Sequence, residues 1–161
     1  MPALVREFPD AKLVIVGDGP LRGALEQQCV ERGVGGSVVF AGWSENVHAY
    51  MRDSDIFALP STAEGFGLVL LEAWFNRLPA VCFDVPAPNE IVTHGVDGLL
   101  VPEQTAGALA EALASLLRNP RRMAGLGENG RRTYERDYTI DVMTRRTIQL
   151  YEELLARRAA A

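Results

Sequence analysis

Two carboxylates eight residues apart, Glu64 and Glu72, flank the segment of this chain best suited to bind a ligand. Between them a predicted helix over residues 66–76 begins, with Gly65 and Gly67 at its start. A helix N-terminus presents unpaired backbone N–H groups and the positive end of its dipole to a phosphate. Glycine lets a ligand approach the backbone closely, and carboxylates accept hydrogen bonds from sugar or ribose hydroxyls. The pattern therefore predicts a site for a polyol that carries phosphate, and a nucleotide sugar has all of these parts.

Each carboxylate also has a purely structural interpretation. An acidic residue just before a helix is often a cap, which would account for Glu64. An acidic residue on a helix surface is usually solvated, which would account for Glu72. The spacing by itself leaves both interpretations open, and the surrounding sequence favours the binding site.

The residues around the two carboxylates resemble a family signature. Pro60–Leu68, running into Leu71–Ala73, is similar to the signature of retaining glycosyltransferases of family 4, which have the GT-B fold. Further segments resemble the strand ends and loops of that family, namely Leu13–Pro20, Val39–Gly42, Ser54–Phe57, Pro79–Val81, Glu90–Val92 and Gly95–Pro102. The resemblance covers about residues 9–102 with specific motifs, and a helical tail without specific motifs follows.

The resemblance implies a role for each part of the motif. It implies that Glu72 accepts hydrogen bonds from the ribose hydroxyls of the donor nucleotide. It implies that Glu64 is the catalytic residue, in contact with the transferred sugar near its reacting carbon. The backbone expected to face the sugar hydroxyls and the diphosphate is that of Gly65, Phe66, Gly67, Leu68 and Val69. The residues expected near the base are Trp43, Ser44 and Val47, and Trp43 either stacks on the base or covers the domain surface.

Short apolar segments alternate with amphipathic segments along the chain. The expected strands cover residues 12–17, 37–41, 55–60, 80–84 and 99–101. The expected helices cover residues 3–8, 21–32, 47–53, 66–76, 89–94, 106–118, 121–136 and 140–157. Strands that are apolar throughout and separated by helices predict an α/β fold, with a parallel sheet covered on both faces. Right-handed crossovers then give one Rossmann-like doubly wound domain over residues 1–161, frayed at 158–161, with ligands beyond the carboxyl ends of the strands.

The resembling family has two Rossmann-like domains, and this chain is similar to the second, donor-binding domain only. The family's first strand and helix of that domain, with an Arg and a Lys that hold the donor diphosphate, are not in this sequence. We therefore expect the chain to be inactive alone and to need an acceptor-binding N-terminal domain in cis or in trans. The alternative is a nucleotide-sugar-binding subunit of a split glycosyltransferase that docks on a separate acceptor-binding protein. An unpaired sheet edge would also permit a homodimer.

For the intact enzyme, the resemblance implies retaining transfer from a nucleotide-diphosphate-sugar donor. The group transferred would be a hexose or N-acetylhexosamine, and the acceptor a glycan, lipid or polysaccharide. The resemblance implies no cofactor and no bound metal. In this mechanism helix-dipole and cationic groups stabilise the diphosphate leaving group.

Composition places the chain among soluble globular proteins. It has 161 residues, of which 48% are apolar and 23% charged, which suits one domain with a substantial core. The net charge of −5 argues against nucleic acid as a partner. Cys29 and Cys82 lie in apolar patterns and are expected to be buried thiols. Neither a secretory signal nor a spanning segment is visible, so we expect a cytoplasmic protein that contacts the inner face of the membrane only through the missing half.

Two further positions carry local expectations. Arg77 stands where the resembling family usually has a glycine, which would supply the left-handed conformation after a helix, so we expect an altered helix end there. His48 and His94 have no carboxylate or nucleophile beside them in the sequence, which favours surface or capping roles.

Overall fold

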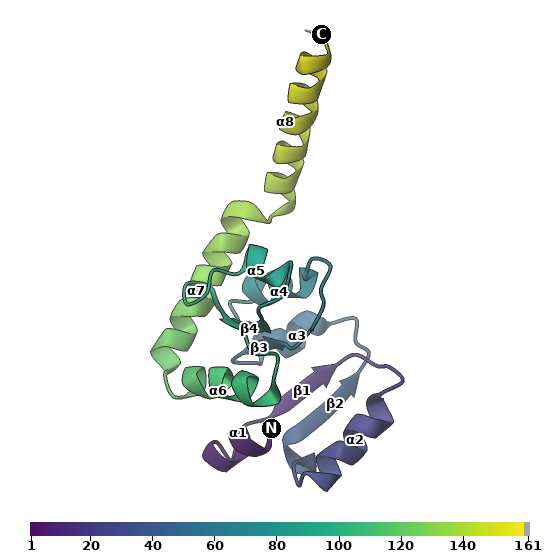
Figure 1. Ribbon diagram of the computed structural model, residues 1–161, viewed down its shortest axis with the longest axis vertical. Coiled ribbons are helices and arrows are strands. Elements are labelled where there is room, and N and C mark those ends of the chain that lie inside the picture. Colours follow the sequence, from purple (N-terminus) through teal and green to yellow (C-terminus); the bar gives the residue numbers. More distant parts are fainter. Residues whose placement is uncertain (160–161) are drawn as a thin grey trace.

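The computed structural model describes residues 1–159 and has the predicted alternation of strands and helices (Figure 1). The strands are β1 (Leu13–Val16), β2 (Val38–Gly42), β3 (Phe57–Leu59), β4 (Ala80–Phe83) and β5 (Gly98–Val101). The helices are α1 (Pro2–Glu7), α2 (Arg22–Glu31), the 3-10 helix η1 (Gly35–Ser37), α3 (Val47–Arg52), α4 (Leu68–Phe75), α5 (Pro88–Ile91), α6 (Ala106–Leu117), α7 (Pro120–Asp137) and α8 (Ile140–Ala159). Each predicted strand and helix is present, with boundaries shifted by a few residues.

The strands form two parallel sheets. β1 pairs with β2, placing Val14 opposite Val39, and β4 lies between β3 and β5 in the second sheet. Within residues 1–159 no strand pairing joins β1 to β3. The parallel Rossmann-like arrangement is thus confirmed, but two hydrogen-bonded sheets stand where the sequence led us to expect one. The edge of β1 away from β2 and the edge of β3 away from β4 both carry unpaired backbone groups.

Helices cover both faces of the second sheet because alternate residues of β4 point to opposite faces. Ala80 and Cys82 pack in a core cluster with Leu70, Leu71 and Trp74 of α4. On the other face, the core consists of residues of β4, β5, α6 and α7 and of the loop after β4, namely Val81, Phe83, Val85, Leu99, Val101, Leu116 and Leu126. Since all four residues of β4 are buried, this strand is the centre of the domain. The packing of α4 on this strand fixes the position of the predicted site.

Helix α4 ends in a left-handed turn at Arg77, which has a φ of 60°. The N–H of Leu78 donates to the carbonyl of Ala73 at 2.9 Å, and that of Arg77 to the carbonyl of Trp74 at 3.0 Å. This is the bonding pattern of a Schellman motif, which glycine normally completes. The expected altered helix end is therefore wrong, because Arg77 adopts the glycine-like conformation. Its guanidinium pairs with Glu128 of α7 at 3.0 Å.

Two glycines of α7 allow this helix to lie directly against α4 and the turn that follows it. A Cβ atom added at Gly130 would stand 2.8 Å from Cγ of Trp74 and closer still to other indole atoms. A Cβ atom added at Gly127 would overlap the carbonyl oxygen of Arg77. No side chain larger than hydrogen fits at either position without displacing α4 or α7. The orientation of α4 therefore depends on a helix more than fifty residues further along the chain.

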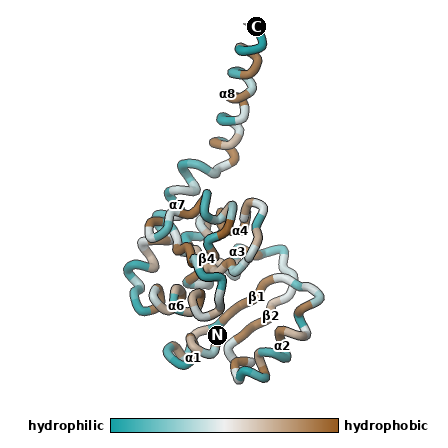
Figure 2. Tube along the Cα trace, in the orientation of Figure 1, coloured by the Kyte–Doolittle hydropathy of each residue, from teal (hydrophilic) through white to brown (hydrophobic). Residues whose placement is uncertain are grey.

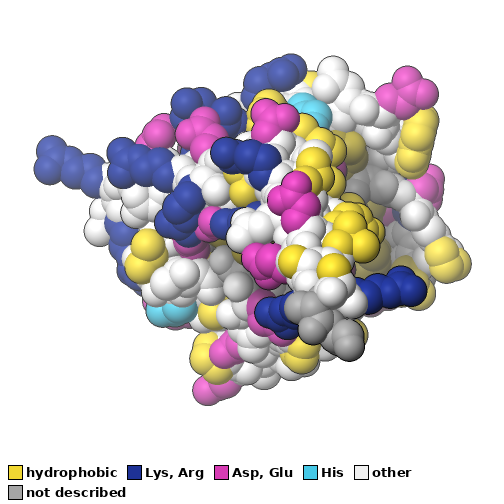
Figure 3. Space-filling view, turned by 90° about the horizontal axis from the view of Figure 1, so that it is seen from above, with side chains coloured by type: hydrophobic (Ala, Val, Ile, Leu, Met, Phe, Trp, Pro, Cys, Tyr) yellow, Lys and Arg dark blue, Asp and Glu magenta, His cyan; other side chains and the backbone are white. Residues whose placement is uncertain are grey.

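Helix α8 extends away from the rest of the chain (Figure 1). It continues to Ala159, so the fraying expected at 158–161 is not found at residues 158 and 159; residues 160–161 lie outside the described part. Of its described side chains only Val142 is buried. Hydrophobic segments recur along α8 in Figure 2, and Figure 3, which looks along it, shows exposed hydrophobic side chains beside charged ones. The exposed apolar residues of α8 are Ile140, Met143, Ile148, Leu150, Tyr151, Leu154 and Leu155.

Among residues 1–159 no helix combines the length and the apolar character that crossing a membrane requires.

Candidate functional site

The N-terminus of α4 is open, as the glycines in its sequence predicted. Gly67 is its N-cap, with a left-handed φ of 85°, and no side chain caps the helix. The helix begins at Leu68 rather than Phe66 because the left-handed Gly67 cannot belong to a right-handed helix. Four successive backbone N–H groups have no hydrogen-bond acceptor among the described residues, namely those of Phe66, Gly67, Leu68 and Val69. These groups and the helix dipole make a binding position for an anion.

The two carboxylates have different surroundings. Glu64 is half-buried, and its Oε1 accepts a hydrogen bond from the N–H of Gly65 at 3.0 Å. The N–H of Gly65 is therefore already paired, unlike its four successors. Glu72 is exposed on α4, and its carboxylate has no hydrogen-bond or ion-pair partner among the described residues. Glu64 thus shapes the turn before α4, whereas Glu72 is free to accept hydrogen bonds from a ligand.

The loops after β1 and β2 meet at the carboxyl ends of these strands. The N–H of Gly17 donates to the carbonyl of Gly42 at 2.7 Å. Ser44, next to Trp43, accepts a hydrogen bond through its Oγ from the N–H of Asn46 at 3.1 Å. Trp43 itself is 73% exposed. Its ring is therefore accessible to a ligand, and stacking on a base stays a prediction.

Helix α3 brings part of the predicted base site to α4. Asn46 caps α3 by accepting a hydrogen bond from the N–H of Ala49 at 3.2 Å. Val47 and Val69 pack against one core cluster, formed by Met51, Ala73 and Leu78. The structure therefore packs Val47 and Val69 of α4 against the same cluster, and it places Trp43 and Ser44 on the loop that leads into α3.

A buried aspartate, Asp97, is bonded to Trp74 of α4 through its backbone carbonyl. Asp97 is 2% exposed, and its carbonyl accepts a hydrogen bond from Nε1 of Trp74 at 2.9 Å. Its carboxylate accepts the N–H of Thr93 at 2.8 Å and the hydroxyl of Thr133 at 3.0 Å. Burial raises the pKa of Asp97, and these two hydrogen bonds oppose the increase. Asp97 therefore joins α4, α7 and the loop before β5, a role that no local pattern predicted.

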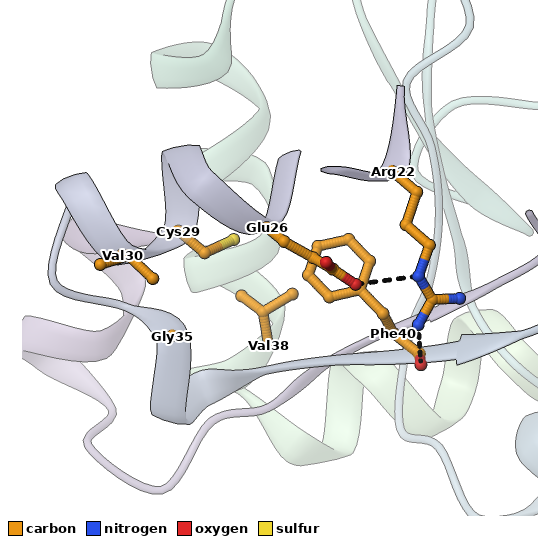
Figure 4. A pocket seen from close by; sticks show the side chains of 7 residues that line it. All are labelled: Arg22, Glu26, Cys29, Val30, Gly35, Val38 and Phe40. Atoms are coloured by element: carbon orange, nitrogen blue, oxygen red, sulfur yellow. Dashed lines mark hydrogen bonds and ion pairs between the residues drawn. The ribbon is translucent and has the colours of Figure 1, made fainter. Parts of the chain in front are cut away.

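An open hollow of about 370 Å³ lies between α2 and β2, away from the predicted site residues (Figure 4). Arg22 crosses one end of it, and its guanidinium donates to the carbonyl of Phe40 at 3.2 Å and to Glu26 at 2.8 Å. Cys29, half-buried, lines the hollow and is not the buried thiol that was expected, whereas Cys82 is fully buried. Burial raises the pKa of the Cys82 thiol to about 12, with a further contribution from Asp84. The hollow contains none of the predicted donor-binding residues.

Acidic residues are spread over the chain rather than clustered. Among residues 1–159 no group of three or more His, Cys, Asp or Glu side chains lies close enough to hold a metal ion. The sequence contains one Asp-x-Asp pair, Asp53-Ser54-Asp55, between α3 and β3. The Asp53–Asp55 pair precedes β3 and Glu64 follows β3, so this pair and Glu64 lie at opposite ends of the strand.

Comparison with known proteins places these features in a family context. A family model described as "Glycosyl transferases group 1" matches residues 1–133. An exopolysaccharide phosphotransferase of Streptomyces coelicolor is 36% identical over 154 residues, which is 94% of this chain and 16% of that protein. The lipopolysaccharide core biosynthesis glycosyltransferase LpsD of Rhizobium meliloti is 30% identical over 154 residues, 96% of this chain and 45% of that protein. The chain thus spans less than half the length of these relatives.

Solved structures have a similar fold over most of this chain. HepE of Anabaena in complex with UDP has a TM-score of 0.82 and 25% identity, covering 89% of this chain and 42% of that chain. Sucrose-phosphate synthase of Thermosynechococcus elongatus has a TM-score of 0.84 and 30% identity, covering 97% of this chain and 41% of that chain. In each case the matched part of this chain is larger than either sheet with its helices, so the match includes residues of both sheets.

Proposed function

This chain belongs to the group 1 glycosyl transferases, and we propose that it is the donor-binding domain of a retaining, metal-independent glycosyltransferase of family 4. The observation that carries the proposal is the open N-terminus of α4 between Glu64 and Glu72. Four free N–H groups suit a diphosphate. The unpaired carboxylate of Glu72, one helical turn after Leu68, suits the ribose hydroxyls. The complex of HepE with UDP supports a nucleoside diphosphate as the ligand.

In this proposal each residue of the motif has one task. Glu72 accepts hydrogen bonds from the ribose hydroxyls, and Trp43, Ser44 and Val47 flank the base. The N–H groups of residues 66–69 hold the diphosphate and the sugar hydroxyls, and Glu64 contacts the sugar near its reacting carbon. A proline at position 68 or 69 would remove an N–H group, whereas trimming the side chains there would leave the N–H groups in place.

The transfer itself breaks the bond between the anomeric carbon and the diphosphate oxygen. The acceptor hydroxyl oxygen forms the new bond to that carbon from the same face, and its proton passes to the departing diphosphate. The negative charge that develops on the diphosphate lies at the positive end of α4, where a fixed dipole stabilises it without reorganisation. The transferred group in this proposal is a hexose or an N-acetylhexosamine, and relatives in lipopolysaccharide and exopolysaccharide assembly support a glycan, lipid or polysaccharide acceptor.

The acceptor must be bound by polypeptide outside the chain described above. We propose an acceptor-binding domain in the same polypeptide, supported by relatives more than twice as long as this chain. A nucleotide-sugar-binding subunit docked on a separate acceptor-binding protein would use the same site. The coding sequence directly upstream of Met1 separates the two: an open reading frame in continuation supports one polypeptide, and a separate gene for the other half supports two. In either case we propose a cytoplasmic location, at the inner face of the membrane.

Nucleotide binding tests the proposed function directly. Ligand-observed NMR of the chain with UDP, GDP and ADP is expected to show binding of one nucleotide, with UDP the first candidate. Addition of the corresponding nucleotide sugars then identifies the donor. Absence of binding of all three at millimolar concentration would contradict the proposal that this domain holds the donor by itself.

The break between the sheets predicts that the isolated chain self-associates. Residues of β1 are apolar but incompletely covered, with Val14 38% exposed and its pairing partner Val39 47% exposed. Unpaired strand edges beside exposed apolar side chains favour pairing with a second molecule. Light scattering at increasing concentration is expected to approach twice the monomer mass. Val14→Lys should shift the equilibrium toward the monomer, whereas Val96→Lys, at a more exposed position (49%) in the loop before β5, should not. A monomer at all concentrations would rule out a homodimer through this edge.

A further inference from the structure

A hydrogen bond between His48 of α3 and Asn76, the C-cap of α4, links the two helices that carry the predicted donor contacts. Nδ2 of Asn76 lies 2.8 Å from Nδ1 of His48 and 2.8 Å from the carbonyl oxygen of Glu72. Both side chains are half-buried. The ring of His48 also packs edge-on against Phe75, with ring centroids 5.5 Å apart. His48 is therefore partly exposed and contacts the C-cap residue of α4.

The chemistry of the partners fixes the direction of this bond. A backbone carbonyl can only accept, so the amide group next to the Glu72 oxygen must be the NH₂ group of Asn76. The same Nδ2 lies 2.8 Å from Nδ1 of His48 and 3.6 Å from Sδ of Met51. Because an amide NH₂ group only donates, Nδ1 of His48 accepts in this contact. The pair forms one defined arrangement rather than two interchangeable ones.

This bond connects positions that would contact opposite ends of one nucleoside. Asn76 holds the backbone of Glu72 twice, through its N–H at 3.2 Å and its side chain at 2.8 Å. His48 follows Val47, which lies at the start of α3. Helix α3 has only six residues, too few to hold its own position without tertiary contacts. The bond therefore helps to set the distance between the start of α3 and the carboxylate-bearing turn of α4.

We propose that His48 and Asn76 are positioning residues for the donor nucleotide. This inference rests on the proposed function, in which α3 contacts the base and Glu72 contacts the ribose. Base and ribose are joined by a single bond, so their two binding groups must keep a fixed separation to act on the same molecule. Loss of the His48–Asn76 bond leaves the apolar packing around Met51 to hold α3 against α4. The nucleotide then makes both sets of contacts at once less often.

The test is the affinity for UDP, measured by calorimetry, together with the melting temperature. His48→Ala and Asn76→Ala are each expected to weaken UDP binding by about 3–10-fold, the range that one lost hydrogen bond supports. The double variant should bind UDP as tightly as the single variant with the lower affinity, because both changes remove the same bond. His48→Gln, whose side-chain oxygen can accept from Asn76, is expected to bind UDP within about twofold of the unaltered chain.

Thr105→Ala is the matched control for a simple loss of stability. Thr105 caps α6 by accepting the N–H of Ala108 at 3.2 Å, and its removal should lower the melting temperature without changing UDP affinity. If His48→Ala lowers the melting temperature but binds UDP as the unaltered chain does, the pair is structural only and this inference is overturned while the proposed function stands. If the unaltered chain binds no UDP, GDP or ADP, the proposed function fails and this inference fails with it.

Discussion

Replacement of Gly130 by alanine is expected to destabilise the chain by roughly 3 kcal/mol, at the upper end of the range for overpacked sites. The added methyl group would overlap the indole of Trp74, which is fully buried and therefore cannot move aside. Alanine is intrinsically the better helix former by about 1 kcal/mol, so the clash must exceed this gain for the protein to lose stability. Chemical denaturation measured by circular dichroism gives the change in the free energy of unfolding.

Gly125 supplies a control within the same helix. A Cβ atom added there meets no other atom within 4 Å. Gly125→Ala should therefore stabilise the chain by about 0.5–1 kcal/mol, through helix propensity alone. Opposite signs for the two substitutions would show that contact with α4, rather than the loss of a glycine, causes the effect. Equal and stabilising effects would mean that α7 lies further from Trp74 than the structure indicates.

The Gly130 substitution also has a functional consequence. Trp74 and Glu72 belong to the same two turns of α4, and Trp74 is held by Asp97 on the side away from the site. Displacement of Trp74 would tilt α4 and move the open N–H groups of residues 66–69. We therefore expect the folded fraction of Gly130→Ala to bind nucleotide more weakly, although position 130 is on a helix that contributes no proposed ligand contact.

Replacement of Glu72 by alanine is expected to weaken UDP binding by about 10–100-fold, because hydrogen bonds to a charged group contribute roughly 1.5–3 kcal/mol. The stability of the fold should not change, since the carboxylate is exposed and has no partner among the described residues. Glu72→Gln retains one carbonyl oxygen as an acceptor and should show a smaller loss. Titration with UDP, followed by calorimetry or NMR, measures the affinities.

The control for Glu72 is a carboxylate on another exposed helix surface. Glu152 of α8 is exposed and forms no ion pair with another described residue, so Glu152→Ala removes the same charge far from the site. It should leave UDP affinity unchanged. Equal affinities for Glu72→Ala and the unaltered chain would identify Glu72 as an ordinary solvated carboxylate, the interpretation that its position on a helix surface alone permits.

The sequence predicted the order and type of the elements because these depend on local signals. Apolar runs such as Ala80–Phe83 and helical periodicities such as Ala106–Leu117 express the burial pattern of a strand or helix within its own length. The open start of α4 was also local, since Gly67 is both the residue that permits the left-handed turn and the reason that no side chain caps the helix. The conformation of Arg77 could not be predicted in this way. The turn that it completes is held by backbone hydrogen bonds and by an ion pair with Glu128 of α7.

The sequence by itself therefore determined the α/β alternation, the family resemblance and the position of the two carboxylates. Only the tertiary structure decided that the strands form two sheets, that Glu72 is unpaired while Glu64 binds its neighbour, that α7 touches Trp74 at Gly130, and that His48 meets Asn76. The physical reason is that each of these depends on how segments far apart in the chain approach one another. A residue carries a local signal for its own conformation, but none for the side chain that packing brings beside it.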